Sequence, residues 1–340
     1  MAELWTIIRL LEWTTQRFEA AGIDSPRADA ERLLADALGC RRIDLYLNRE
    51  RIPDGEPLER FREFVRRRTK REPLQFILKR APFLFLELDV DESTLIPRPE
   101  TEILVERAVH LAKCLTGAYQ RMAGRDPSGR SALLEPFDVE NQSASDPQTA
   151  IESASPKSAV VENADPPFYV LDVGTGSGCI ALGFASCFKN ATLYATDISA
   201  DAVALAKRNA EKTGLSNRVE FAAGDLFDAL PVNAPAFDLI LSNPPYIADS
   251  DRADLQREVR DWEPSSALFA GKDGLSVIRR LINGAPDILK PGGRLVLEIG
   301  DGQANAVREL FAADGRYDDI QTTLDLSKIE RVIDARRIAE

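Results

Sequence analysis

Apolar residues recur at helical spacing over the first 75 residues. The stripe from Ile7 to Phe18 predicts a first helix, which Gly22 ends. Ser25-Pro26 then places a capping hydroxyl ahead of a proline at the first helical position, and Gly39 ends this second helix. Residues 1–75 are therefore expected to form a small helical bundle.

A third helix is predicted from about Pro57, and its two faces differ in charge. One face is apolar, and the other carries the basic side chains Arg60, Arg62, Arg66, Arg67, Lys70 and Arg71. These charges fit either a solvated face or a docking surface for an acidic or ribonucleoprotein partner. Because the bundle has no catalytic constellation, we expect residues 1–75 to recognise a macromolecular substrate.

Short strand-like runs replace the helical pattern after Glu72. Residues 73–77 and 83–90 predict a β-hairpin linker over residues 76–97. Two prolines then hold the chain extended, and a helix begins at Glu100 or Thr101. Arg98 and Glu100 are expected either to form a capping pair or to lie at the edge of a site.

Residues 98–340 are expected to form a second domain with one interruption. From 115 to 167 the chain is rich in Gly, Ser, Pro, Asn and Gln and shows almost no periodicity. We interpret this stretch as a disordered insertion without chemistry of its own.

Strands and helices alternate in the rest of the second domain. Strands are predicted at 168–173, 191–196, 219–222, 237–242 and 294–299, with helices between them and a last strand near 329–333. This βαβ order indicates an open, parallel α/β sheet with right-handed crossovers.

Composition and charge narrow the function. The chain has 340 residues and a net charge of -12, which argues against binding dominated by a nucleic-acid backbone. Its four cysteines form no Cys-x-x-Cys pair and there is a single histidine, His110, so we expect no metal site and a reducing cytoplasm. No signal peptide or membrane span is apparent.

The first candidate site is a glycine-rich loop between a strand and a helix. It reads Gly174-Thr175-Gly176-Ser177-Gly178, and glycines let a backbone approach a nucleotide-like ligand closely. Asp172 precedes the loop and could meet a cationic amino-acid group, whereas Asp197 ends the next strand, where an acid can hold ribose hydroxyls. The pattern favours S-adenosyl-L-methionine (SAM) over a dinucleotide. Asp225 and Leu226 either edge and cover its adenine or form a plain turn.

The second candidate site is Asn243-Pro244-Pro245-Tyr246, which follows the buried strand 237–242. Open α/β sheets bind ligands at the carboxyl ends of their strands. The prolines lack N–H groups and have restricted φ angles, so their carbonyl groups are presented in a fixed direction. Such an acceptor-rich clamp suits an –NH₂ substrate; an ordinary Pro-rich turn is the alternative.

In this order, the motifs resemble those of the release-factor glutamine N5-methyltransferases, the HemK or PrmC family. The resemblance rests on Leu95–Glu102, Val170–Gly178, Gly224–Phe227 and Ser242–Ile247, and it extends to Glu263-Pro264, Pro291–Gly293 and Leu297–Gly300. Asn-Pro-Pro-Tyr alone is shared with amino-methylating DNA enzymes. Two departures are a lysine at Lys79, where the family usually has glycine, and the long stretch 115–167.

The resemblance implies a Rossmann-like class I SAM-dependent methyltransferase domain with a seven-stranded, mostly parallel sheet. It implies methyl transfer from SAM to the amide N5 of the glutamine in the Gly-Gly-Gln motif of class I peptide-chain release factors. Gly174–Gly178 and Asp197 would then bind SAM, Leu226 would pack on adenine, and Asn243–Tyr246 would hold the glutamine. We expect a cytoplasmic monomer without membrane or duplex-DNA binding.

An amide nitrogen is a weak nucleophile because its lone pair is delocalised. The side-chain oxygen of Asn243 and the carbonyl of Pro244 can accept hydrogen bonds from the two N–H groups of the substrate amide, while Tyr246 packs on the amide plane. His110 is expected to have a structural role. Two other interpretations stay open: an adenine-N6 or cytosine-N4 DNA methyltransferase, and a cofactor-binding adaptor without catalysis.

Overall fold

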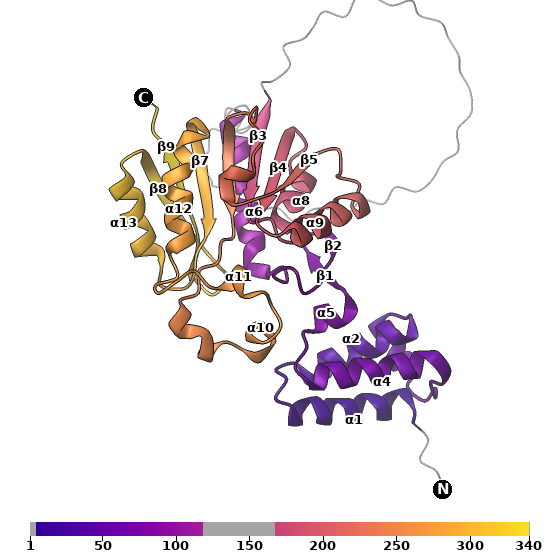
Figure 1. The fold of residues 1–340 in the computed structure, drawn as a ribbon. Helices are drawn as coiled ribbons and strands as arrows, with labels where there is room; N and C mark the ends of the chain where they lie inside the picture. The colour runs from indigo at the N-terminus through magenta and orange to yellow at the C-terminus, as the bar shows by residue number, and fades with distance from the viewer. Residues whose placement is uncertain (1–4, 118–166, 340) are drawn as a thin grey trace, which may run out of the picture.

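The computed structural model describes residues 5–117 and 167–339. Its N-terminal part is a helical bundle (Figure 1) of α1 (Ile7–Ala20), α2 (Pro26–Leu38), α3 (Arg42–Leu47) and α4 (Gly55–Thr69). Buried side chains of the bundle, among them Phe18, Leu33 and Phe61, share one core. Gly39 ends α2 in the left-handed conformation, as predicted, but Ser25 makes no side-chain capping hydrogen bond. Helix α3 was not predicted.

The segment after the bundle corrects one prediction. Residues 74–78, expected to be a strand, form the short helix α5 (Leu74–Leu78). Leu74 and Ile77, three residues apart, pack into the core of the bundle, whereas Phe76 joins a separate cluster with Ala81. So short an apolar run does not distinguish a strand from a buried helix by periodicity. The hairpin itself is present as β1 (Arg80–Phe83) paired antiparallel with β2 (Leu86–Asp89).

The backbone at the end of α5 adopts a conformation that favours glycine, although the residue there is a lysine. Lys79 caps α5 with a φ of 57°, in the left-handed region that favours glycine. The chain therefore keeps the geometry with a lysine.

A seven-stranded sheet forms the second domain. Its strands are β3 (Phe168–Val173), β4 (Ala191–Asp197), β5 (Val219–Ala223), β6 (Phe237–Ser242), β7 (Leu289–Glu298), β8 (Tyr317–Leu324) and β9 (Glu330–Arg337). They lie in the order β5-β4-β3-β6-β7-β9-β8, with β9 antiparallel to both of its neighbours and the other pairs parallel. The expected mostly parallel sheet is confirmed, and β8 is an addition.

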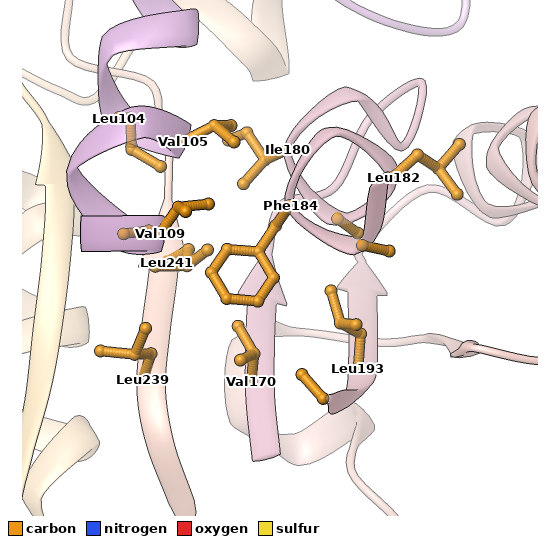
Figure 2. Close-up of a cluster of buried hydrophobic side chains, with 14 of the residues drawn as sticks. Leu104, Val105, Val109, Val170, Ile180, Leu182, Phe184, Leu193, Leu239 and Leu241 are labelled. Atoms are coloured by element: carbon orange, nitrogen blue, oxygen red, sulfur yellow. The ribbon is translucent and has the colours of Figure 1, made fainter. Parts of the chain in front are cut away.

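Helices cover both faces of the sheet (Figure 1). The major ones are α6 (Pro99–Leu115), α8 (Cys179–Cys187), α9 (Ala200–Lys212), α12 (Ser276–Gly284) and α13 (Ala304–Asp314). Figure 2 shows one core, in which Val105 of α6 and Phe184 of α8 pack over Val170 and Leu241 of the sheet. Helices α12 and α13 supply the core of the opposite face. Short helices complete the connections: η1 (Leu226–Ala229), η2 (Asp249–Asp254), α10 (Arg257–Arg260), α11 (Ser265–Leu268) and η3 (Ala285–Asp287).

The strand order creates a switch point between β3 and β6. From β3 the chain moves outward to β4 and β5, and then returns to place β6 on the other side of β3. The connections that leave β3 and β6 therefore diverge at one edge of the sheet, where such folds bind ligands.

The stretch expected to be a disordered insertion, 115–167, lies outside the described residues except for 115–117 and 167.

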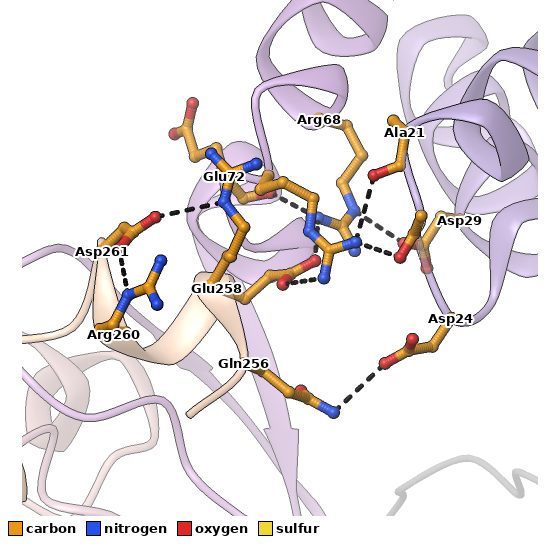
Figure 3. A network of polar contacts seen from close by, with 12 residues as sticks. Ala21, Asp24, Asp29, Arg68, Glu72, Gln256, Glu258, Arg260 and Asp261 are labelled. Atoms are coloured by element: carbon orange, nitrogen blue, oxygen red, sulfur yellow. Dashed lines mark hydrogen bonds and ion pairs between the residues drawn. The ribbon is translucent and has the colours of Figure 1, made fainter. Parts of the chain in front are cut away.

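The bundle contacts the sheet domain through α10 (Figure 3). Glu258 accepts a hydrogen bond from Arg68 at 2.9 Å and from Arg71 at 2.6 Å. Arg68 also donates to Asp29 of the bundle at 2.8 Å.

Candidate active site

A cavity lies at the switch point and gathers most of the predicted site. It is lined by Arg98, Gly174, Thr175, Gly176, Ser177, Asp197, Asp225, Leu226, Asn243, Pro244 and Pro245 among others. Asp172, Gly178, Glu100 and Tyr246 do not line it. The glycine loop after β3 and the Asn-Pro-Pro-Tyr turn after β6 thus border the same space.

Backbone geometry explains the glycines of the loop. Gly174, Gly176 and Gly178 have φ angles of 74°, 56° and 84°. A Cβ on Gly178 would also lie 3.2 Å from the Cβ of Ala206 in α9. The N–H groups of Gly174 and Thr175 donate to the carbonyl of Thr196 at 2.8 and 2.9 Å, which ties the loop to the end of β4.

Asp172 stabilises the glycine loop through hydrogen bonds of its side chain. Its Oδ2 accepts a hydrogen bond from the hydroxyl of Thr175 at 2.6 Å and from the N–H of Ala181 at 3.1 Å. The residue is fully buried, and burial raises the pKa of this carboxyl to about 7. The structure therefore gives Asp172 a role in shaping the loop.

Asp197 stands at the cavity wall with acceptor capacity to spare. Its Oδ2 accepts from the N–H of Gly176 and its Oδ1 from the N–H of Ser199, both at 2.9 Å. A carboxylate has about four lone-pair positions, so both oxygens can still accept a hydroxyl. Burial raises the pKa of Asp197. The arrangement suits a ribose diol.

Two buried hydroxyl groups of the cavity make no hydrogen bond within the described chain. The hydroxyls of Thr94 and Thr196 are buried, line the cavity and have no hydrogen-bond partner within the described chain. Buried polar groups are normally satisfied by protein, water or ligand, so these hydroxyls are suited to a polar ligand in the cavity. Neither threonine was predicted, because an isolated hydroxyl carries no motif.

Asp225 and Leu226, the two residues predicted to lie beside the adenine, have different environments. Asp225 pairs with Arg280 of α12 at 2.8 Å near the cavity rim. Leu226 has a φ of 47°, uncommon for a leucine, and begins η1 beside the cavity.

The side-chain amide of Asn243 is held on one side only. Its Nδ2 donates to Oγ1 of Thr101 at 3.1 Å, and the Thr101 hydroxyl donates to Oε2 of Glu298 at 2.7 Å. This leaves Oδ1 of Asn243 as the acceptor on the cavity side. Sequence reasoning gave no role to Thr101 or Glu298, although both lie within motifs of the resemblance.

Tyr246 is anchored at both ends. Its hydroxyl lies 3.4 Å from Oε1 of Glu298, and its carbonyl accepts from Nε2 of Gln303 at 2.9 Å. Burial raises the pKa of the tyrosine hydroxyl, which stays protonated. The turn is thus fixed from the side of β7 and α13.

Arg98 and Glu100 have different surroundings in the structure. Arg98 donates to Glu263 at 2.6 Å, and this buried glutamate belongs to the segment between β6 and α12. Burial raises the pKa of Glu263. Glu100 is exposed in the first turn of α6. Arg98 therefore joins two walls of the cavity at its edge.

Two features are absent from the described residues. Within 5–117 and 167–339, no three His, Cys, Asp or Glu side chains gather as a metal-binding group. In the same ranges no helix is long and apolar enough to cross a membrane.

Two family models match this chain, one in each domain. Residues 9–78 match the model described as PrmC N-terminal domain, and residues 165–327 match a methyltransferase domain. The release factor glutamine methyltransferase of Rhodopirellula baltica is 37% identical over 333 residues, covering 98% of this chain and 97% of that protein. The chain belongs to the release factor glutamine methyltransferase family. The resemblance inferred from the sequence is confirmed.

Other members of the release factor glutamine methyltransferase family align over a similar extent. That of Geobacter sulfurreducens is 37% identical and covers 98% of both chains, and that of Chlorobaculum tepidum is 36% identical and covers 97% of this chain and 96% of its own. A solved methyltransferase structure from Pyrococcus furiosus is more distant, at 21% identity, 50% coverage of this chain, 75% of that chain and a TM-score of 0.39.

Proposed function

We propose that this protein transfers a methyl group from SAM to the side-chain amide nitrogen of the glutamine in the Gly-Gly-Gln motif of peptide-chain release factors. The observation that carries this proposal is the Asn243 amide, whose Nδ2 is occupied by Thr101 while its Oδ1 remains free to accept. The family and the names of its members support a release factor as the protein substrate. The cytoplasm is the expected compartment.

The residues around the cavity fit SAM. Asp197 offers acceptors for ribose hydroxyls, the positive-φ glycines allow close backbone approach, and Leu226 can cover an adenine. When bound, SAM supplies the electrophilic sulfonium methyl group.

The protein's own contribution is orientation and charge stabilisation. The Oδ1 atom of Asn243 and the carbonyl of Pro244 accept the two N–H bonds of the substrate amide and so turn its nitrogen toward the methyl donor. As the nitrogen bonds to carbon it becomes positive, and these two fixed dipoles stabilise that charge. The leaving group is a neutral thioether, and the extra proton passes from the methylated amide to solvent water. No covalent enzyme intermediate is required.

The bundle is proposed to hold the body of the release factor. A cleft between α2, α4 and the β1–β2 hairpin is lined by Arg32, Arg42, Arg60 and Arg80 and extends to Pro97 and Pro99. These prolines flank Arg98, which lies at the edge of the cavity. A partner seated in the cleft could therefore extend a loop to Asn243.

Incubation with labelled SAM and either a release factor or duplex DNA tests the proposal. We expect label in the release factor, and mass spectrometry should place one methyl group on the glutamine of its Gly-Gly-Gln peptide. Label in DNA alone would refute the proposal and favour the amino-methylating DNA enzyme.

Replacing Asn243 separates catalysis from cofactor binding. Asn243→Ala removes one acceptor of the clamp, so we expect kcat to fall by roughly 100-fold or more, with SAM affinity almost unchanged. Calorimetric titration with SAM and initial-rate measurements check this. Asn217→Ala, at an exposed turn, is the control and should keep the wild-type rate. A wild-type rate for Asn243→Ala would exclude the clamp.

A further inference from the structure

Thr101 and Glu298 form a buried chain of hydrogen bonds behind the Asn243 amide. Thr101 lies in the first turn of α6 and Glu298 at the end of β7, and each is 1% exposed. The Thr101 hydroxyl stands between Nδ2 of Asn243 at 3.1 Å and Oε2 of Glu298 at 2.7 Å. Three separate segments thus meet at one hydroxyl.

The chemistry of these groups fixes the direction of the chain. Burial raises the pKa of Glu298 to about 7, so above pH 7 this carboxyl group is ionised, only accepts hydrogen bonds, and takes the single hydroxyl proton of Thr101 at 2.7 Å. The lone pairs of Thr101 that remain can accept only from a donor, and Asn243 must therefore turn its NH₂ group toward Thr101. Its oxygen then faces the cavity.

The reversed amide would be costly at both ends. Rotating Asn243 by half a turn would bring its oxygen against the lone pairs of Thr101 without a proton between them. Such buried acceptors would be left unpaired, which destabilises the reversed orientation. The rotated amide would also present N–H donors to a substrate that itself brings N–H donors.

We propose that Thr101 and Glu298 are positioning residues that hold the Asn243 amide with its oxygen toward the substrate nitrogen. This inference rests on the proposed function and assigns these two side chains to it.

Two hydroxyl groups, those of Thr101 and Tyr246, contact the carboxyl group of Glu298. The hydroxyl of Tyr246 lies 3.4 Å from its second oxygen, Oε1. Burial most strongly disfavours its ionised form, the charge of Glu100 of α6 adds to this effect, and Arg331 of β9 favours the ionised form. The carboxylate therefore also connects the turn after β6 to the positioning chain.

Steady-state kinetics of full-length variants with an intact release factor and SAM test this assignment. Thr101→Val keeps the shape and removes the hydroxyl, so kcat should fall by about 10- to 100-fold, while KM for the release factor and the Kd for SAM stay within about threefold. Thr101→Ser should restore most of kcat. Glu298→Gln can donate to Thr101 and thereby permit the rotated amide, and should lower kcat by a similar factor.

A matched control is available in the bundle. Thr14 is also completely buried and its hydroxyl has no partner within the described chain, so Thr14→Val makes the same change far from the site. This variant should keep wild-type kcat, and thermal unfolding of each variant reports whether it folds.

Distinct results would overturn distinct claims. Wild-type kcat for Thr101→Val, or an equally low kcat for Thr101→Ser, would show that the hydroxyl does not position Asn243. If Thr101→Val fails to fold, wild-type kcat in Glu298→Gln would exclude the positioning chain in its place. A wild-type enzyme that leaves release factors unmethylated would refute the proposed function itself.

Discussion

The carboxyl group of Asp172 is an acid enclosed beneath the glycine loop. Its usual pKa of 3.8 rises to about 7 because burial disfavours the charged form, although Thr175 and Ala181 donate to it. The unfolded chain loses this proton near pH 4, whereas the folded chain keeps it up to about pH 7. The folded state therefore becomes relatively less stable as the pH rises from 4 to 7.

Asp172→Asn should weaken this dependence, because an amide accepts the same hydrogen bonds without becoming charged. We expect the fall in melting temperature between pH 5 and pH 8 to be smaller in the variant than in the wild type, as measured by calorimetry. Asp254→Asn, at an exposed position, is the control and should leave the fall unchanged. An unaltered pH dependence in Asp172→Asn would contradict the burial argument.

At the scale of single residues, the sequence predicted those parts of the cavity that are formed by contiguous motifs. The glycine loop and the Asn-Pro-Pro-Tyr turn are contiguous strings, so their meeting at the switch point followed from strand order. Thr101 and Glu298 are 197 positions apart, and Arg98 and Glu263 are 165 apart. No local pattern links such pairs, and the folded chain alone brings them together.

Among the elements, periodicity predicted those with one clear apolar face. It located α1, α2, α4 and the central strands, but not α3, α5 and β8. Helices α3 and α5 have six and five residues, too few to establish a period. Strand β8 lies at the sheet edge, and of its residues only Tyr317 is buried, so its polar sequence resembles a loop.

In the segment between β6 and α12, one glycine occupies a position that has no room for a side chain. Gly274 has a φ of 71°, and a Cβ there would lie 2.2 Å from the carbonyl oxygen of Tyr246. That contact is with backbone, so the Asn-Pro-Pro-Tyr turn would have to move. Reacting groups displaced by about 1 Å lose about 100-fold in rate.

Gly274→Ala should therefore lower kcat by at least about 10-fold. Gly271→Ala is a close control: its φ is 79°, but a Cβ there would meet only Ser276 at 3.7 Å. Both variants carry the strain of a positive φ, about 1 kcal/mol. Initial rates should fall much further in Gly274→Ala, and equal rates would exclude displacement of the turn.

At the scale of the whole molecule, the basic side chains of α4 pair with the chain's own acids, partly on the exposed surface. The sequence left its basic face as either solvated or a docking surface. Four arginines of α4 form ion pairs, namely Arg60 with Asp36, Arg62 with Glu59, Arg66 with Glu63 and Arg67 with Glu72. Arg68 of the same helix joins Asp29 to Glu258. Much of this charge is thus neutralised within the molecule.

Glu258 is the shared carboxylate of the junction between the bundle and α10 (Figure 3). Its side chain is 15% exposed, and those of Arg68 and Arg71 are 8% and 11% exposed. Glu258→Ala leaves two buried guanidinium groups short of a partner, which should lower the free energy of unfolding by about 3 kcal/mol. Urea denaturation measures this loss.

The same variant should also affect the larger substrate selectively. Because the bundle is proposed to hold the body of the release factor, we expect Glu258→Ala to raise KM for the intact protein several-fold. Its activity on a short Gly-Gly-Gln peptide should not change. Asp261→Asn disturbs an exposed ion pair of α10 and should do neither. An equal loss with both substrates would show that the junction shapes the cavity itself.

The junction also constrains the exchange of modules between relatives. Asp24 faces Gln256 across it, and Arg68 and Arg71 face Glu258. Glu263, five residues beyond Glu258, holds Arg98 at the cavity. A chimaera that takes only a foreign bundle would pair new side chains with the old α10. A graft intended to redirect substrate choice must therefore carry Gln256 and Glu258 with the bundle and leave Glu263 with Arg98.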